Sequence, residues 1–279
     1  LPFMSRPHAQ LELRAWALLA VPTGVLTGGV TGVLIHSAFA GTGPNWLLGI
    51  AMALVTGAGP IANVTSALWA RWSHGRDKVI ALMQLQAAFA ACLLAAAIAP
   101  VSLAGLLVLV VMTLTARTMW SGTLTIRAIV WRANYDRRSR TAIAARTQII
   151  VSLIMAGVGA LAGLALDLDA ENYRWLYVIC AAAGIAGMVT LRRIKVRRQR
   201  QLLTSERAGP RRPLPNAYLA ILRDDHLYRK YLAWLMVLGA GTMMLTAPLI
   251  LVLTNTLGAD RFTQVLISTA LPMLLMPIT

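Results

Sequence analysis

Acidic residues are the scarcest charged class in this sequence. The chain of 279 residues contains ten Asp or Glu against 26 Lys or Arg, and only 13% of its residues are charged. A soluble domain of this size would carry about a quarter charged residues. With 58% hydrophobic residues and a mean hydropathy of +0.66, the composition excludes an ordinary soluble protein and favours a helical integral membrane protein.

Several chemical signatures are also missing. The sequence has no Gly-Lys-Ser/Thr phosphate-binding loop, no cluster of metal ligands and no Ser-His-Asp candidate set. Its two cysteines, Cys92 and Cys180, lie inside apolar runs, which suggests neither a disulfide nor a metal site. We therefore expect no enzymatic activity, no cofactor and no metal.

Long hydrophilic runs are absent with one exception, Leu191–Pro215, which carries nine basic residues and one acid. This run separates eight apolar segments, six before it and two after it, so the sequence predicts an all-α membrane protein with about eight transmembrane helices. The segments are 15–35, 46–70, 79–98, 103–126, 147–166, 175–191, 231–257 and 262–279.

The basic residues indicate an orientation for these segments. If the apolar segments all cross the membrane, 23 of the basic residues fall on one side, two on the other, and Arg117 lies within a span. Positive charge accumulates in cytoplasmic loops, so we expect the N-terminus in the cytoplasm. The net charge of +16 then reflects topology, and nucleic acid is not an expected partner.

The linker also suggests a division of the chain. Residues 1–191 would form an N-terminal six-helix bundle, and 192–229 a basic cytoplasmic linker with a short interfacial helix within NAYLAILRDDHLYRKYL. Residues 230–279 would be the first two helices of an incomplete C-terminal bundle. A weak repeat supports this plan, since one segment opens AWALLAVPTG and another AWLMVLGAGT.

The loop SALWARWSHGRDKV carries a resemblance to the major facilitator superfamily of transporters. Gly75, Arg76 and Lys78 match the second half of that family's loop signature, whereas Leu68 and Trp72 stand where the family has Gly and an acid. The resemblance implies two helix bundles around a central cavity, in a multi-pass protein of the cell membrane, of the bacterial inner-membrane type. It also implies membrane lipids and a small-molecule substrate as partners, with a coupling ion that the sequence does not identify.

Arg117 is the sharpest candidate for a substrate contact. In LTARTMWSGT it resembles the Arg that precedes small residues in the family's fourth helix. An isolated Arg within a span is unfavourable by several kcal/mol, so it must face the bundle interior, a water-filled cavity or a partner. The alternative is a structural Arg that bonds backbone carbonyls.

Other polar residues complete the expected substrate pathway. Thr23, Thr27 and Thr31 repeat every four residues and share one helix face, which would line the cavity or, alternatively, bond its own backbone. Asn63 follows Gly59-Pro60 and would contact substrate or satisfy backbone groups at a kink. Gln84 and Gln86 are expected at the membrane interface.

A cytoplasmic gate is expected where two inner loops meet. The gate would join the loop between the second and third segments to the loop between the fourth and fifth. Its expected members are Arg71, Gly75, Arg76, Asp77, Lys78, Asp136 and Arg138.

The leading functional hypothesis is a secondary active transporter that moves a small solute, anionic or drug-like, by alternating access. An anionic or polar substrate is preferred because Arg117 is the only charge in the predicted core. The alternative is a non-transporting relative that acts as a membrane scaffold, assembly factor or sensor. Short loops and missing catalytic clusters argue against a membrane enzyme or the permease subunit of an ATP-driven system.

Overall fold

The structure is a computed structural model that describes residues 7–208 and 223–276, with all but a few of their side chains. These residues are mainly helical and include no strand. In chain order the elements are α1 (Pro7–Val25), α2 (Gly28–Ala38), α3 (Asn45–Thr56), α4 (Ala58–Val64), α5 (Ser66–Trp72), α6 (Lys78–Ala97), α7 (Leu103–Asn134), α8 (Arg137–Leu168), η1 (Ala170–Asn172), α9 (Tyr173–Leu191), α10 (Gln199–Ala208), α12 (His226–Asn255), α13 (Arg261–Val265), η2 (Leu266–Ala270) and α14 (Leu271–Leu275).

Four of the described helices, α6 to α9, are long and apolar enough to cross a membrane by length and composition. Two bent pairs, α1 with α2 and α3 with α4, raise the number to six if each pair forms one span. The all-helical prediction is therefore confirmed, and the apolar helices are compatible with a multi-pass membrane protein. The finer expectation of eight spans stays a prediction.

The bend in each of the two helix pairs has an identifiable local cause. The first bends by 41° between α1 and α2, where Pro22 lies one turn before the break and glycines flank it. The second bends by 54° at Gly57, between α3 and α4, with Pro60 in the next turn. Proline and glycine are the usual residues at sharp kinks. The prediction of one uninterrupted helix over 15–35 is therefore wrong at Leu26 and Thr27.

The two bends contact each other. A Cβ atom added to Gly28 would lie 2.9 Å from the backbone Cα of Thr56, the last residue of α3, so only glycine permits this approach. A third irregularity meets them, because η2 is a π turn and the hydroxyls of Thr27 and Thr269 lie 3.5 Å apart. Three departures from regular helix thus lie together where the α1–α2 pair packs against the C-terminal helices.

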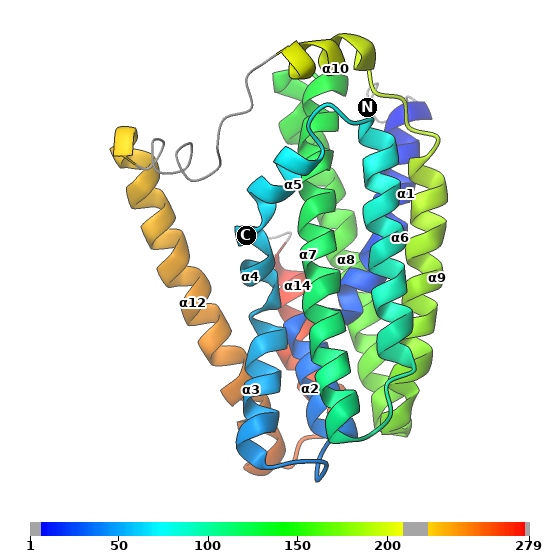
Figure 1. The fold of residues 1–279 in the computed structure, drawn as a ribbon. Coiled ribbons are helices and arrows are strands. Elements are labelled where there is room, and N and C mark those ends of the chain that lie inside the picture. The colour runs from blue at the N-terminus through cyan, green and yellow to red at the C-terminus, as the bar shows by residue number, and fades with distance from the viewer. Residues whose placement is uncertain (1–6, 209–222, 277–279) are drawn as a thin grey trace.

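The C-terminal helices pack against the N-terminal bundle mainly at one end. There α2 and α3 contact α12, and α8 contacts α13, η2 and α14. Figure 1 shows α12 beside α3 at this end and diverging from α4 and α5 toward the end that carries α10 and the start of α1. Leu227, Tyr231 and Trp234, on the diverging part of α12, are exposed apolar side chains.

The close contact between the two bends predicts a selective effect of one methyl group. Gly28→Ala should destabilise the protein by about 1–3 kcal/mol, because the backbone of Thr56 must shift to admit the Cβ atom. Gly49→Ala in α3 is the matched control, since nothing lies within 4 Å of its added Cβ atom. Thermal unfolding in detergent measures both variants, and equal melting temperatures would contradict the proposed contact.

Candidate functional site

Arg117 lies near the middle of α7 among polar groups that lack partners. Thr113 precedes it by one turn and is 1% exposed, while Tyr177, on α9, is fully buried and lies within electrostatic range. No described residue hydrogen-bonds with Arg117 Nε, the Thr113 hydroxyl or the Tyr177 hydroxyl. The two hydroxyls are near each other but fall short of hydrogen-bond geometry. We call these three residues the Arg117 cluster.

The Arg117 cluster can donate several hydrogen bonds to one acceptor. Guanidinium N–H groups and two O–H groups are donors, and buried donors without partners are rare in native proteins. Among the described residues, no carboxylate forms an ion pair with Arg117. The arrangement therefore suits a ligand with negatively charged oxygens, because such a ligand would supply both the missing acceptors and the missing charge.

The threonine face of the first span lies elsewhere. Thr23 and Thr31 are buried and donate to carbonyls of the preceding helical turn, at 2.9 Å and 2.8 Å respectively. Thr27 also donates backward, to Gly24, and meets Thr269 across the junction with η2. None of these hydroxyls bonds with the Arg117 cluster, and Asn63 is exposed on α4. The predicted pathway residues are thus not brought together around Arg117.

The loop before α6 is held by an acid from the linker. The ammonium of Lys78 is fully buried and lies 2.7 Å from the carboxylate of Glu206 on α10. The same carboxylate accepts from the backbone N–H of Gly75 at 2.7 Å, and Lys78 also donates to the Ser73 carbonyl at 2.6 Å. Gly75 has a φ of +71°, a conformation that suits glycine. We call Ser73, Gly75, Lys78 and Glu206 the linker clasp.

The remaining residues of the expected gate have local roles. Asp77 accepts from the N–H groups of Val79 and Ile80 and so caps α6, and Arg76 lies over the ring of Trp72 at 4.9 Å. Arg71 is exposed, and Asp136 accepts from Ser139 within its own turn. The side chain of Arg138 lies outside the described residues. A gate between the two inner loops stays a prediction.

Sequence reasoning missed a buried carboxylate, that of Glu12 in α1. Glu12 is 3% exposed and accepts a 2.8 Å hydrogen bond from the Tyr135 hydroxyl. Beside it, the Arg127 guanidinium lies between the rings of Trp16 and Trp131, at 3.8 Å and 3.9 Å. These five residues form the Glu12 cluster. The only signal in the sequence was the spacing of four residues between Arg127 and Trp131 on one helix, because Trp16 lies 111 residues away.

Burial and the neighbouring Glu12 carboxylate keep the Tyr135 phenol protonated. Burial first, and then the neighbouring carboxylate, raise the pKa of the Tyr135 phenol well above its ordinary value. Tyr135 follows the last residue of α7 and ties it to α1. The phenol therefore remains a donor to Glu12 over the whole physiological pH range.

Gln86 corrects another expectation. Gln84 is exposed, but Gln86 is fully buried near the middle of α6 and donates to the Thr123 hydroxyl of α7 at 2.8 Å. The interfacial placement of Gln86 was therefore wrong. Spacing explains the error, because residues two apart on a helix face different sides.

No metal-ligand cluster of three or more His, Cys, Asp or Glu occurs among the residues that the structure describes. Comparison of the chain with protein families, with curated proteins and with solved structures finds no match.

Loss of the clasp carboxylate should loosen the linker. In Glu206→Gln the buried ammonium of Lys78 loses its charged partner, which should destabilise the protein by about 2 kcal/mol. The basic linker should then be cut faster by trypsin. Glu171→Gln is the control, because its pair with Arg174 spans 3.7 Å between exposed side chains and contributes little. Identical trypsin cleavage rates in both variants would refute the clasp.

The raised pKa of Tyr135 predicts an alkaline dependence of stability. An unfolded tyrosine loses its proton near pH 10, whereas folded Tyr135 keeps it, so the unfolded state binds fewer protons above that pH. Stability should therefore fall as pH rises through about 10, and it should fall less in Tyr135→Phe. Melting temperatures of both proteins from pH 8 to 11 measure the difference. Parallel curves would show that Tyr135 does not contribute.

Proposed function

We propose that this chain belongs to a secondary active transporter of the major facilitator type, which moves a small anionic solute across a membrane by alternating access. The observation that carries the proposal is the Arg117 cluster. It combines a guanidinium that no described carboxylate neutralises with two buried hydroxyls that have no hydrogen-bond partner among the described residues. Such a site within a bundle of membrane-length helices is a binding-site hypothesis by default.

The donors favour a carboxylate or a similar oxyanion as the bound group. A guanidinium forms strong, directional hydrogen bonds to the two oxygens of such a group, and the hydroxyls of Thr113 and Tyr177 would add neutral donors. A cationic solute would be repelled, since no described acid pairs with Arg117. The substrate class is therefore a small solute with at least one negatively charged oxygen group.

The helix packing supports movement of two halves against each other. Contacts between the N-terminal bundle and the C-terminal helices concentrate at one end, where the two bent spans and the π turn meet. At the other end α12 diverges (Figure 1). We infer that the bends and the π turn form the joint of a rocking movement, because interrupted helices are common near transporter sites.

We place the diverging end on the cytoplasmic side of a cell membrane. The linker helix α10 and the start of α1 lie at this end, as Figure 1 shows. The basic residues of the linker would then obey the positive-inside rule. In this orientation, the space between α12 and the N-terminal bundle opens toward the cytoplasm. The linker clasp then holds the cytoplasmic loop before α6.

The test is transport by the full-length protein in sealed vesicles. The probes are radiolabelled lactate, succinate and benzoate, with tetraphenylphosphonium as the cationic comparison. Arg117→Ala should lower uptake of the transported anion at least about tenfold, because a charge-assisted hydrogen bond is lost. Arg132→Ala, an exposed Arg on the same helix, is the matched control and should keep uptake near the wild-type rate.

Two outcomes would contradict the proposal. Unchanged anion uptake by a folded Arg117→Ala protein would remove the cluster from the pathway. Uptake of none of the probes by the wild-type protein would favour the alternative, a non-transporting scaffold, assembly factor or sensor.

A further inference from the structure

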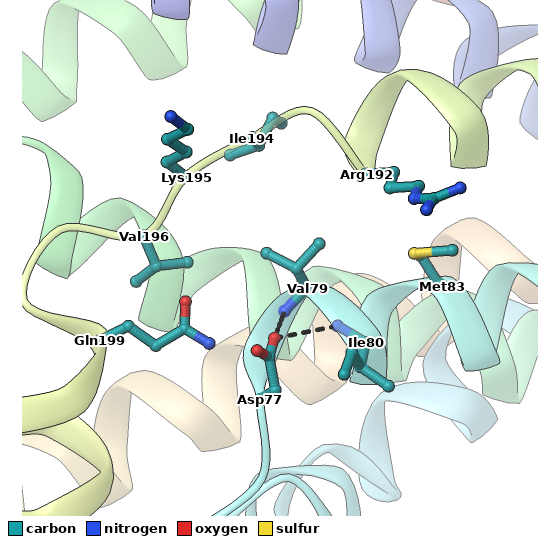
Figure 2. A pocket seen from close by; sticks show the side chains of 9 residues that line it. All are labelled: Asp77, Val79, Ile80, Met83, Arg192, Ile194, Lys195, Val196 and Gln199. Atoms are coloured by element: carbon teal, nitrogen blue, oxygen red, sulfur yellow. Dashed lines mark hydrogen bonds between the residues drawn. The ribbon is translucent and has the colours of Figure 1, made fainter.

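A cavity of about 620 Å³ lies between the start of α6 and the segment that follows α9. Figure 2 shows Val79 and Ile80 of α6 across from Val196 and Gln199, with Arg192 on the side of Met83 and the Lys195 side chain extending outward from the opposite wall. The residues that line it are Asp77, Val79, Ile80, Met83, Arg192, Ile194, Lys195, Val196 and Gln199. None of them belongs to the Arg117 cluster.

The segment that forms one wall is anchored to the bundle. Ile194 and Val196 are 5% and 8% exposed, and they alternate with the exposed Lys195 and Arg197. The side chain of Asn134, at the end of α7, donates to the Lys195 carbonyl at 3.2 Å and accepts from the Arg197 N–H at 2.8 Å. The basic side chains therefore extend from a fixed backbone.

The charge of the cavity is positive. Arg192 and Lys195 are exposed, and no described acid forms an ion pair with either. Asp77 is the one carboxylate in the lining, and it accepts from two N–H groups of α6, as the dashed lines in Figure 2 show. The lining thus offers two cations and the Gln199 amide to a negatively charged ligand.

The cavity also lies where a membrane surface would meet the protein. Arg192 directly follows α9, and Asp77 directly precedes α6, and these two packed helices are both long enough to cross a membrane. Below the charged edge, the lining continues along α6 with Ile80, which is 55% exposed, and the partly exposed Met83. A polar edge above an exposed apolar helix face matches the two parts of a phospholipid.

We propose that this cavity binds the headgroup of an anionic phospholipid in the adjoining membrane leaflet. Arg192, Lys195 and Gln199 would hold the phosphate, and Ile80 and Met83 would contact the start of an acyl chain. Basic pockets at the cytoplasmic ends of transmembrane helices suit such headgroups. A free phosphate ion shares the charge, but it would leave the apolar wall without a partner. The proposal does not depend on transport or on Arg117.

Binding is measured with the purified full-length chain in detergent micelles, by native mass spectrometry. The probes are palmitoyl-oleoyl phosphatidylglycerol, the zwitterionic phosphatidylcholine with the same acyl chains, and inorganic phosphate. The double variant Arg192→Gln with Lys195→Gln should lower phosphatidylglycerol affinity about tenfold or more, because the loss of each cation should lower the affinity a few-fold. Phosphatidylcholine affinity should change little.

The matched control is Arg193→Gln with Arg197→Gln, which removes the same charge from exposed positions of the same segment outside the cavity. It should retain at least half of the phosphatidylglycerol affinity. Equal losses in both double variants would overturn the proposal, because they would show general surface electrostatics rather than a site.

A third variant separates lipid from free phosphate. Ile80→Ser removes apolar contact at an exposed position and should weaken phosphatidylglycerol binding several-fold. If Ile80→Ser binds phosphatidylglycerol as the wild type does, or if millimolar inorganic phosphate displaces the lipid completely, the cavity is an ion site and the lipid proposal is wrong.

Discussion

Burial of charge in an apolar helix bundle is the constraint on which the rest of this structure depends. A buried ion is strongly unfavourable unless another charge, a hydrogen bond or an aromatic face compensates it. Lys78 obtains a carboxylate from the linker, and Arg127 lies between two tryptophan rings near Glu12. Among the described residues, no carboxylate forms an ion pair with Arg117, and its Nε atom has no hydrogen-bond partner. This difference distinguishes a candidate binding group from two structural ones.

The same reasoning links the linker to the bundle. The acid of the linker clasp comes from α10, about 130 residues away in sequence from the loop that it holds. The Asn134 side chain holds the preceding part of the linker through two backbone groups. A segment that reads as a hydrophilic spacer is therefore docked along part of its length. Its docking also shapes the cavity at the ends of α6 and α9.

Much of the fold could be predicted because hydrophobic runs and breaker residues are local signals. Seven of the predicted segments each begin or end within a few residues of the boundary of a described helix. The eighth segment extends past the described residues. The bend at Leu26 and Thr27 was missed, since Pro22 and its neighbouring glycines permit a kink without requiring one. The interfacial helix expected within 216–232 falls partly outside the described residues, whereas α10, which was not predicted, lies earlier in the linker.

The sequence by itself determined the helical class, the apolar segments and the position of Arg117 within one of them, because each depends on residues that are close in the chain. The tertiary structure alone decided which groups are paired. It placed Glu206 against Lys78, Tyr135 against Glu12, and Tyr177 near Arg117. Those pairings depend on how helices pack across long sequence separations, and helix packing of similar apolar surfaces leaves no signature in a single sequence.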